Sequence, residues 1–216
     1  MLNSFADAGA NSPDEWVQTQ IQAVEQAQSP EALMAAVQAL ASSKSSAAIP
    51  ALIAVFGYNN PAASAIALGS VIAWGDAAVT PLMTQMDEYN YGARAYSMRC
   101  LATIASVQSL EVLIKAATTD FAPSVRRAAA KGLGHLRWQD LPDSAQVDTQ
   151  QQVFMALNSL CEDGDWSIRY AGIVGLQALG QRNQALGQIV GDFLELYQHR
   201  EPDRSVLARI QLAYNK

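Results

Sequence analysis

Charged residues are scarce in this chain of 216 residues, and those present are biased toward acid. Asp, Glu, Lys and Arg together make up 16% of the sequence, and the net charge is −6. Proteins that bind nucleic acid through its phosphates need a basic surface, so we expect no nucleic-acid partner. No apolar run approaches the roughly 20 residues of a transmembrane helix, so we expect no membrane span.

Cysteine and histidine are also rare, with two of each. Two cysteines supply neither a disulfide framework nor a four-ligand zinc site, so we expect no metal. Cys100 and Cys161 lie in apolar helical stretches, which predicts buried free thiols and a reducing compartment. Residues 1–13 have neither the basic nor the apolar segment of a secretory signal, and we expect a cytoplasmic location.

Motifs of self-contained catalytic sites are missing. The sequence has no His-Glu-x-x-His, no Walker loop and no Gly-x-Gly-x-x-Gly. His135 and His199 are far apart along the chain, and neither shares a helical turn with a cysteine. Nothing favours a Ser-His-Asp or Cys-His arrangement, so the catalytic residues stay unknown.

The sequence does contain internal repeats. The phrase Asp-Phe-Ala-Pro-Ser-Val-Arg-Arg-Ala-Ala-Ala-Lys-Gly-Leu at 120–133 has a shorter copy at 165–176 and a weaker one at 90–101. In each copy a Leu follows an Arg by seven positions. The copies are roughly 32 to 43 residues apart, a spacing typical of stacked-helix solenoids. A second phrase, with Pro50 and Pro81 at helix starts, alternates with the first.

These repeats predict an all-α fold. We expect a HEAT-like or armadillo-type right-handed α-α superhelix of about five or six helical pairs, forming a single domain over 1–216. Residues 1–12 are expected to be flexible, and the polar segment 139–149, with Pro142, is expected to be an inserted loop. The helices are predicted at 14–28, 31–42, 48–57, 62–74, 79–88, 92–105, 109–118, 123–137, 150–162, 166–180, 184–199 and 204–214.

Two predicted helices show how neighbours should pack. Each has an apolar face that includes glycine: Val125, Ala129, Gly132, Leu133 and Leu136 in the first, Ile168, Gly172, Gly175, Leu176 and Leu179 in the second. Glycine inside a helix costs about 1 kcal/mol relative to alanine. Its repeated use on one face therefore predicts close approach of the neighbouring helices.

Arginine, aspartate and aromatic residues gather at the starts of the repeats. Arginine suits carboxylates or phosphates, and aromatic rings provide flat walls for a conjugated ligand. The candidate binding residues are Tyr91, Arg94, Asp120, Arg126, Arg127, Trp138, Asp165, Trp166, Arg169 and Tyr170. A structural alternative applies to Asp120, Arg126, Asp165 and Arg169, which can instead form an ion-pair ladder between successive repeats.

Two phrases together resemble a known family. Tyr-Asn-Tyr-Gly-Ala-Arg at 89–94 and Asp-Phe-Ala-Pro-Ser-Val-Arg-Arg at 120–127 are similar to those of the E/F-type phycobilin lyases of cyanobacteria, which are HEAT-like repeat proteins. The similarity covers about residues 31–180 and is greatest to the F-type subunits. Such a resemblance implies a heterodimer with an E-type subunit that joins phycocyanobilin, as substrate, to a cysteine of the phycocyanin α chain by a thioether bond.

The resemblance also implies how the candidate residues are used. The nucleophile belongs to the substrate protein, no cofactor is needed, and arginines pair with the propionates of the pigment. Asp120 or Asp165 accepts pyrrole N–H bonds, and the aromatic residues line the pigment. Two alternatives stay open: a relative that detaches bilin during phycobilisome degradation, and a non-enzymatic repeat scaffold or chaperone for phycobiliproteins. An obligate partner also predicts an exposed apolar patch on the terminal repeats.

Overall fold

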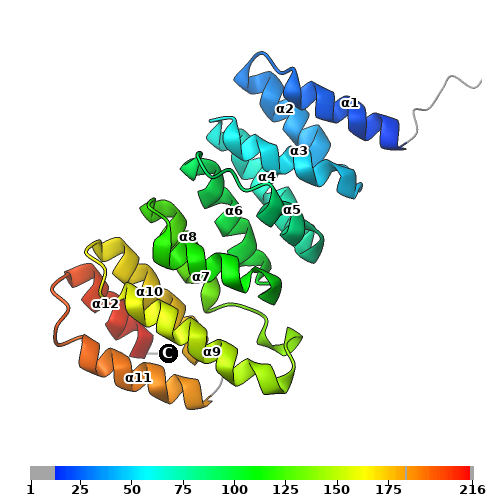
Figure 1. Ribbon diagram of the computed structural model, residues 1–216. Coiled ribbons are helices and arrows are strands. Elements are labelled where there is room, and N and C mark those ends of the chain that lie inside the picture. The colour runs from blue at the N-terminus through cyan, green and yellow to red at the C-terminus, as the bar shows by residue number, and fades with distance from the viewer. Residues whose placement is uncertain (1–12, 183, 215–216) are drawn as a thin grey trace, which may run out of the picture. The chain divides into compact units, whose positions relative to one another are not determined.

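The computed structural model describes residues 13–182 and 184–214, and its regular secondary structure in those ranges is entirely helical (Figure 1). All twelve predicted helices are present. Their bounds are α1 Pro13–Glu25, α2 Pro30–Ala41, α3 Ile49–Ala54, α4 Pro61–Ala73, α5 Val79–Thr84, α6 Tyr91–Ile104, α7 Leu110–Thr119, α8 Pro123–Leu133, α9 Asp143–Leu160, α10 Trp166–Gly180, α11 Gln184–Tyr197 and α12 Arg204–Tyr214. Residues 1–12 lie outside the described ranges, so flexibility there stays a prediction.

The helix starts follow from local chemistry. Proline occupies one of the first two positions of α2, α3, α4 and α8, where its missing N–H would have no helical partner anyway. Side chains cap other starts: the amide oxygens of Asn60 and Asn90 accept hydrogen bonds from the backbone N–H groups of Ala63 and Ala93. Such caps satisfy N–H groups that the first helical turn leaves free.

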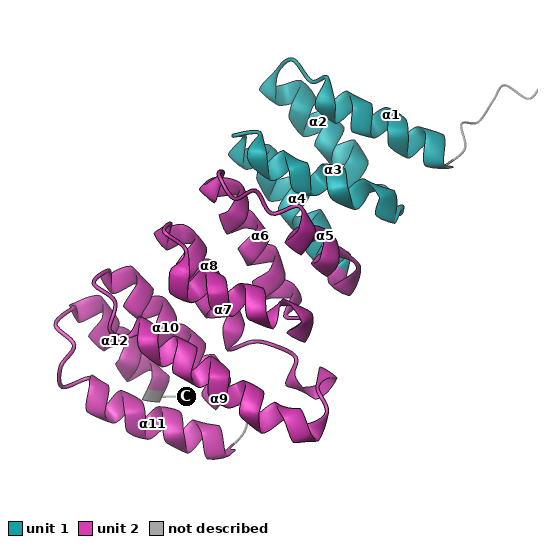
Figure 2. Ribbon diagram, viewed as in Figure 1, with its two compact units in different colours: residues 1–74 teal, residues 75–216 magenta. Residues whose placement is uncertain are grey.

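The chain divides into two compact units (Figure 2). The first ends at Trp74 and contains α1 to α4, in which α2 packs against both α1 and α4. Its core includes Val37, Leu40, Leu52 and Val71, all fully buried. The second unit begins at Gly75 and contains α5 to α12. A single domain over 1–216 and the handedness of the superhelix stay predictions.

Within the second unit the even-numbered helices stack in order: α6 packs on α8, α8 on α10, and α10 on α12. Figure 1 shows α6, α8 and α10 following one another, with α7 and α9 beside them. The two predicted apolar faces are confirmed as buried, with Val125, Leu133 and Leu176 fully excluded from solvent. Each helix pair therefore buries its apolar face against the next pair.

Glycines bring these helices close together. A Cβ added at Gly132 would lie 2.5 Å from the Cβ of Ala102 on α6. One added at Gly175 on α10 would lie 2.5 Å from the carbonyl oxygen of Ala130 on α8. Both distances are shorter than real Cβ contacts, so the predicted close approach is confirmed at both positions.

Some predicted boundaries were wrong. Helix α5 ends at Thr84 rather than 88, because the Asp87 carboxylate accepts hydrogen bonds from the N–H groups of Tyr89 and Asn90 and turns the chain. Helix α9 begins at Asp143, so most of the predicted loop 139–149 is helical. Pro142 directly precedes this helix, where its ring disturbs no helical hydrogen bond.

None of the described helices combines the length and the apolar character that crossing a membrane requires.

Gly175→Ala should destabilise the protein by about 2 kcal/mol, because the new methyl group meets backbone that cannot move without separating α8 from α10. Gly69→Ala in α4 is the matched control. Its Cβ meets nothing within 4 Å, so alanine should stabilise the helix by up to about 1 kcal/mol. Urea unfolding of both variants measures these changes in stability. Equal changes in the free energy of unfolding for Gly175→Ala and Gly69→Ala would contradict the close approach of α8 and α10.

Candidate active site and its surroundings

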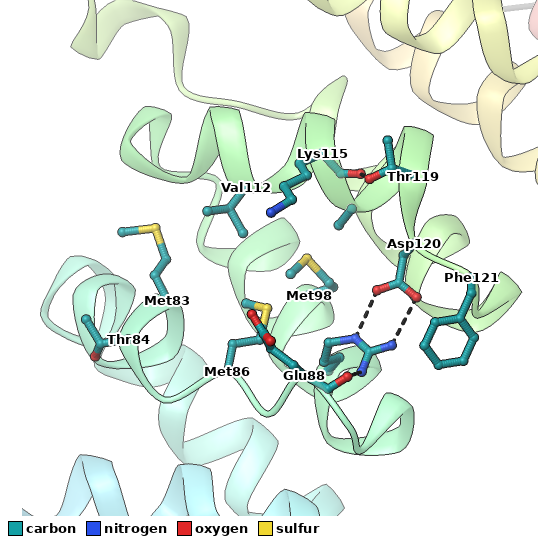
Figure 3. Close-up of a pocket in the computed structure, with 12 residues that line it drawn as sticks. Met83, Thr84, Met86, Glu88, Met98, Val112, Lys115, Thr119, Asp120 and Phe121 are labelled. Carbon is teal, nitrogen blue, oxygen red and sulfur yellow. Dashed lines mark hydrogen bonds and ion pairs between the residues drawn. The ribbon is translucent and has the colours of Figure 1, made fainter.

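An ion-pair ladder runs along the stacked even-numbered helices. Its first pair joins Arg94 on α6 to Asp120, which precedes α8, with Nε to Oδ2 at 2.9 Å and Nη2 to Oδ1 at 3.1 Å. The dashed lines to Asp120 in Figure 3 mark this pair. The Arg94 guanidinium also donates to the carbonyl oxygens of Asp87 and Glu88 and lies 5.0 Å from the ring centroid of Phe121.

The next two pairs continue the ladder: Arg169 holds its acid through Nε and Nη2 as Arg94 does, whereas Arg126 contacts its acid through Nη2 and donates from Nε to the carbonyl oxygen of Ala117. Arg126 on α8 pairs with Asp163 before α10 at 2.7 Å, and Arg169 on α10 pairs with Glu201 before α12 at 2.7 Å. In all three pairs the arginine lies three residues after the first residue of its helix, and the acid lies three residues before the first residue of the next even-numbered helix. The ladder alternative is thus confirmed for Asp120, Arg126 and Arg169.

The ladder corrects the candidate list. Its arginines already have carboxylate partners, so Arg94, Arg126 and Arg169 are not free to bind a ligand's carboxylates. Asp120 is likewise occupied by Arg94. Asp165, predicted as a ladder acid, is not one: it caps α10 and accepts hydrogen bonds from the Ser167 N–H and hydroxyl through Oδ1.

Sequence reasoning missed the ladder acids Asp163 and Glu201. It aligned Asp120 with Asp165 because an aromatic residue follows each. Counting back from the helix starts would have found the acids, since Asp163 and Glu201 hold the same position as Asp120. The acid's register follows the helix start because its carboxylate must reach an arginine on the previous even-numbered helix.

Trp138 is a second correction. It was predicted to line a ligand, but it lies in the short 3-10 helix Trp138–Asp140 and is only 4% exposed. Neighbouring Arg137 holds this segment in place by pairing with Asp76 and Asp140 and donating to the carbonyl oxygen of Ile104. Trp138 therefore packs in the core and presents no surface to a ligand.

Four of the predicted residues do meet in one groove, formed by α8, α10 and the start of α12. Arg127, Asp165, Trp166 and Tyr170 line it, and its volume is about 690 Å³. Lys131, Ser167 and Ser205 complete the lining; sequence reasoning had not selected them. We call this the α8–α10 groove. Ligand pockets commonly have volumes of about 300–1,000 Å³, so it is large enough for a small molecule.

The charges in the α8–α10 groove differ from those of the ladder. Arg127 donates from Nη1 to the Ser167 hydroxyl at 2.9 Å, a neutral partner. Within the described ranges neither Arg127 nor Lys131 forms an ion pair with a carboxylate. Hydrogen bonds from the Ser167 hydroxyl and N–H lower the pKa of Asp165, which keeps its carboxylate ionised at neutral pH.

Tyr91 lies elsewhere. It is the first residue of α6 and is 57% exposed, but it does not line the α8–α10 groove. A second groove, of about 540 Å³, lies between α5 and α7 (Figure 3). Its lining includes Met83, Met86 and Met98, and the Arg94–Asp120 pair borders it. Its arginine is thus already held by a carboxylate, whereas Arg127 forms no direct ion pair with a described residue.

Neither thiol is placed for nucleophilic chemistry. Cys100 and Cys161 are fully buried. Burial raises the pKa of each thiol to about 12, so at neutral pH both are protonated. The predicted burial of both thiols is confirmed, and a thiolate for covalent chemistry would have to come from another molecule. Within the described ranges, no group of three or more His, Cys, Asp and Glu side chains is arranged to hold a metal ion.

Comparison with known proteins identifies the family. Residues 32–58 match the PBS lyase HEAT-like repeat. The phycocyanin alpha phycocyanobilin lyase CpcF of Synechocystis sp. is 47% identical over 88% of this chain and 89% of its own length. The chain belongs to the CpcF family of phycocyanobilin lyase subunits. A phycocyanobilin lyase subunit beta from Thermosynechococcus vestitus, 48% identical over 91% of this chain and 93% of its own, is a further relative.

A solved structure of the family agrees with the fold. The complex of CpcE and CpcF of phycocyanin lyase from Nostoc sp. PCC7120 contains a chain that is 51% identical, with a TM-score of 0.76, over 79% of this chain and 99% of that chain. With the helical-repeat match, this confirms the predicted HEAT-like fold class and the predicted CpcF-type family.

The last ladder pair is the most buried, so it offers the sharpest test of what the ladder contributes. The Glu201 side chain is 0% exposed, and the Tyr197 hydroxyl lies 2.7 Å from its Oε2. Burial alone would raise the pKa of Glu201, but hydrogen bonds from Arg169 and Tyr197 outweigh it and lower the pKa. Glu201→Gln should therefore cost about 3 kcal/mol of stability at neutral pH, since it leaves Arg169 without its counter-charge.

Because the pKa is lowered in the folded state, this stabilisation is present above the unfolded value of about 4.3 and is lost as the pH falls through the folded value. The difference in the free energy of unfolding between wild type and Glu201→Gln, measured with urea, should thus become smaller below about pH 4. Glu162→Gln is the control, since its pair with Arg200 is exposed and should contribute about 0.5 kcal/mol. If the difference in unfolding free energy between wild type and Glu201→Gln did not depend on pH, the ion pair could not be its source.

Proposed function

We propose that this chain is the F-type subunit of a heterodimeric lyase. Together with an E-type subunit, it attaches phycocyanobilin by a thioether bond to a cysteine of the phycocyanin α chain. The observation that carries the proposal is the similarity to a phycocyanin alpha phycocyanobilin lyase, which extends over 88% of this chain at 47% identity. Phycocyanobilin is the substrate, and the reaction needs no further cofactor.

The chemistry assigns the reactive thiol to the acceptor protein. Its sulfur bonds to the ethylidene carbon of the pigment's A ring, and the thiol proton passes to the pigment. Because this is an addition, no group leaves and no oxidant or reductant is needed. The buried, protonated state of Cys100 and Cys161 agrees with a lyase that supplies no nucleophile of its own.

What remains for the lyase is to hold and orient the pigment. Fixing two reactants in the correct geometry removes much of the entropic barrier to their reaction. The α8–α10 groove contains the groups this needs: cations for the propionates, an ionised Asp165 for pyrrole N–H groups, and the rings of Trp166 and Tyr170 for the conjugated system.

The test is co-expression of this chain with an E-type subunit, the apo α chain of phycocyanin and a source of phycocyanobilin. A covalent, fluorescent α-chain adduct should form only when both subunits are present. A non-enzymatic scaffold would leave the adduct yield unchanged when this chain is omitted. A detaching relative would instead release pigment from α chains that already carry it.

We also propose where the E-type subunit binds. Large apolar side chains are exposed on α9 and α11, toward the C-terminal end of the repeats: Val147 (69%), Met155 (63%), Ile189 (49%) and Leu196 (74%). An apolar hollow lined by Val147, Phe154 and Ile189 lies between these helices. Large exposed apolar patches are typical of protein interfaces, and an array end of this kind is where a partner was expected.

Ile189→Asp together with Val147→Asp should weaken association with the E-type subunit at least tenfold, because charges would be buried without partners. Co-purification or calorimetric titration measures this. Leu212→Asp on α12, also exposed at 53%, is the control and should leave association unchanged. Unchanged association in the α9–α11 variant would move the interface to another surface.

A further inference from the structure

Two cations on α8 stand apart from the ladder. Arg127 and Lys131 are one helical turn apart, which puts their Cβ atoms about 5–6 Å from each other, and both line the α8–α10 groove. Like charges at this spacing repel and slightly destabilise a helix. In the described part of the chain, no carboxylate forms an ion pair with either residue. The groove therefore presents two cationic groups outside the ladder; the Asp165 carboxylate interacts with Arg127 only through the Ser167 hydroxyl, and Lys131 has no carboxylate partner among the described residues.

Flat apolar walls lie across the groove from these cations. Trp166 and Tyr170 are one turn apart on α10, the helix that packs on α8. Trp166 is 48% exposed although it is large and apolar. Aromatic rings at this spacing can contact one extended conjugated ligand at two points. The walls and the cations together fit a planar anion better than a polar peptide.

A fixed carboxylate completes the groove. Asp165 is held at the start of α10 by the Ser167 N–H and hydroxyl, and the same hydroxyl accepts a hydrogen bond from Arg127. Only Oδ1 of Asp165 accepts hydrogen bonds from the described residues, which leaves Oδ2 as an acceptor for a ligand N–H. The groove thus offers two sites for ligand carboxylates and one for ligand N–H groups.

We infer that the α8–α10 groove binds the pigment through its two propionate carboxylates, with Arg127 and Lys131 as their counter-charges, and that this chain supplies the site without its partner subunit. The inference rests on the proposed function. Bilins carry two propionates on neighbouring rings, with pyrrole N–H groups between them, which corresponds to two cations one turn apart and one carboxylate. Arg127 suits bidentate binding, and Lys131 acts as a point charge.

The second groove lacks this arrangement. Arg94 at its border is neutralised by Asp120, so Lys115 is the cation in its lining that forms no ion pair with a described residue. A dianion is therefore expected in the α8–α10 groove and not between α5 and α7.

The test is titration of the isolated full chain with phycocyanobilin and with its dimethyl ester, followed by absorbance. The ester keeps the conjugated system but lacks both propionate charges. Wild type should bind the diacid much more tightly than the ester. The double variant Arg127→Gln, Lys131→Gln should lose about 100-fold in affinity for the diacid and bind the ester as wild type does.

The matched control is Lys44→Gln with Lys115→Gln, which removes the same total charge from exposed positions outside the groove. It should bind the diacid as wild type does. Thermal unfolding should show at most a small loss of stability in the Arg127, Lys131 variant, since the change removes both a repulsion and the hydrogen bond from Arg127 to Ser167. Equal binding of diacid and ester by wild type, or unchanged diacid binding by this variant, would overturn the inference. Binding only by the heterodimer would overturn the claim that this chain supplies the site alone.

Measuring attachment separately distinguishes this inference from the proposed function. If the wild-type heterodimer joins no pigment to the α chain, the proposed function fails whatever the groove binds. If it does join pigment and the Arg127, Lys131 variant keeps the same KM for phycocyanobilin, only the inference fails. A raised KM with little change in kcat is the result expected for residues that bind the propionates equally in the ground and transition states.

Discussion

The ion-pair ladder is the interaction on which the second unit depends. Each of its arginines joins a carboxylate in the turn before the next even-numbered helix, and each also donates to a backbone carbonyl oxygen near its own helix. One side chain thus satisfies polar groups in two turns at once. Arg94 and Arg169 are largely buried with their acids, so removing one partner would leave a charge without compensation in a poorly solvated place. A shift of one repeat relative to the next would separate these charges, so the energetic cost of an unpaired buried charge favours one register between successive repeats.

The ladder also explains which residues are available for function. It uses one arginine per repeat at a constant position and leaves the following residue outside the network. In α8 that residue is Arg127, whose side chain points into the α8–α10 groove instead. Close glycine contact keeps α8 and α10 together, so the two walls of the groove belong to rigid, tightly packed elements. A site built on such elements holds its ligand groups more precisely than one built on loops.

This division suits an enzyme whose nucleophile belongs to its substrate protein. The fold contributes neither a reactive thiol nor a catalytic triad, and both cysteines are buried and protonated. What it offers is a repeat scaffold with an open, charged and aromatic groove on one surface and exposed apolar side chains on α9 and α11. Binding a pigment and binding a partner can thus be assigned to separate surfaces of one unit. Catalysis then consists mainly in holding the reactants together.

Periodicity and local chemistry were enough to predict the helices, the repeat class and the family. Each of the twelve helices overlaps the segment in which the apolar pattern predicted it. This is because helix formation depends on local signals: the spacing of apolar residues, and the proline or asparagine at a helix start. The errors at α5 and α9 concerned helix boundaries. The turn held by the Asp87 carboxylate follows the end of α5, and Pro142 stands directly before the start of α9. The phrases at 89–94 and 120–127 pointed to the family through their residues alone.

The candidate site was only partly predictable. Sequence named Arg127, Asp165, Trp166 and Tyr170 among ten candidates. It offered the ladder as an alternative for Arg126 and Arg169, but it assigned Asp165 to that ladder as well and left Arg94 out, because all lie in similar phrases. The tertiary structure distinguished them, because a ladder arginine can be identified only from the carboxylate that lies within ion-pair distance of it. It also buried Trp138 and brought Lys131 into the groove. The sequence by itself determined the repeating architecture, which rests on local patterns. Only the packing of successive even-numbered helices decided which charges are neutralised and which remain open to a ligand.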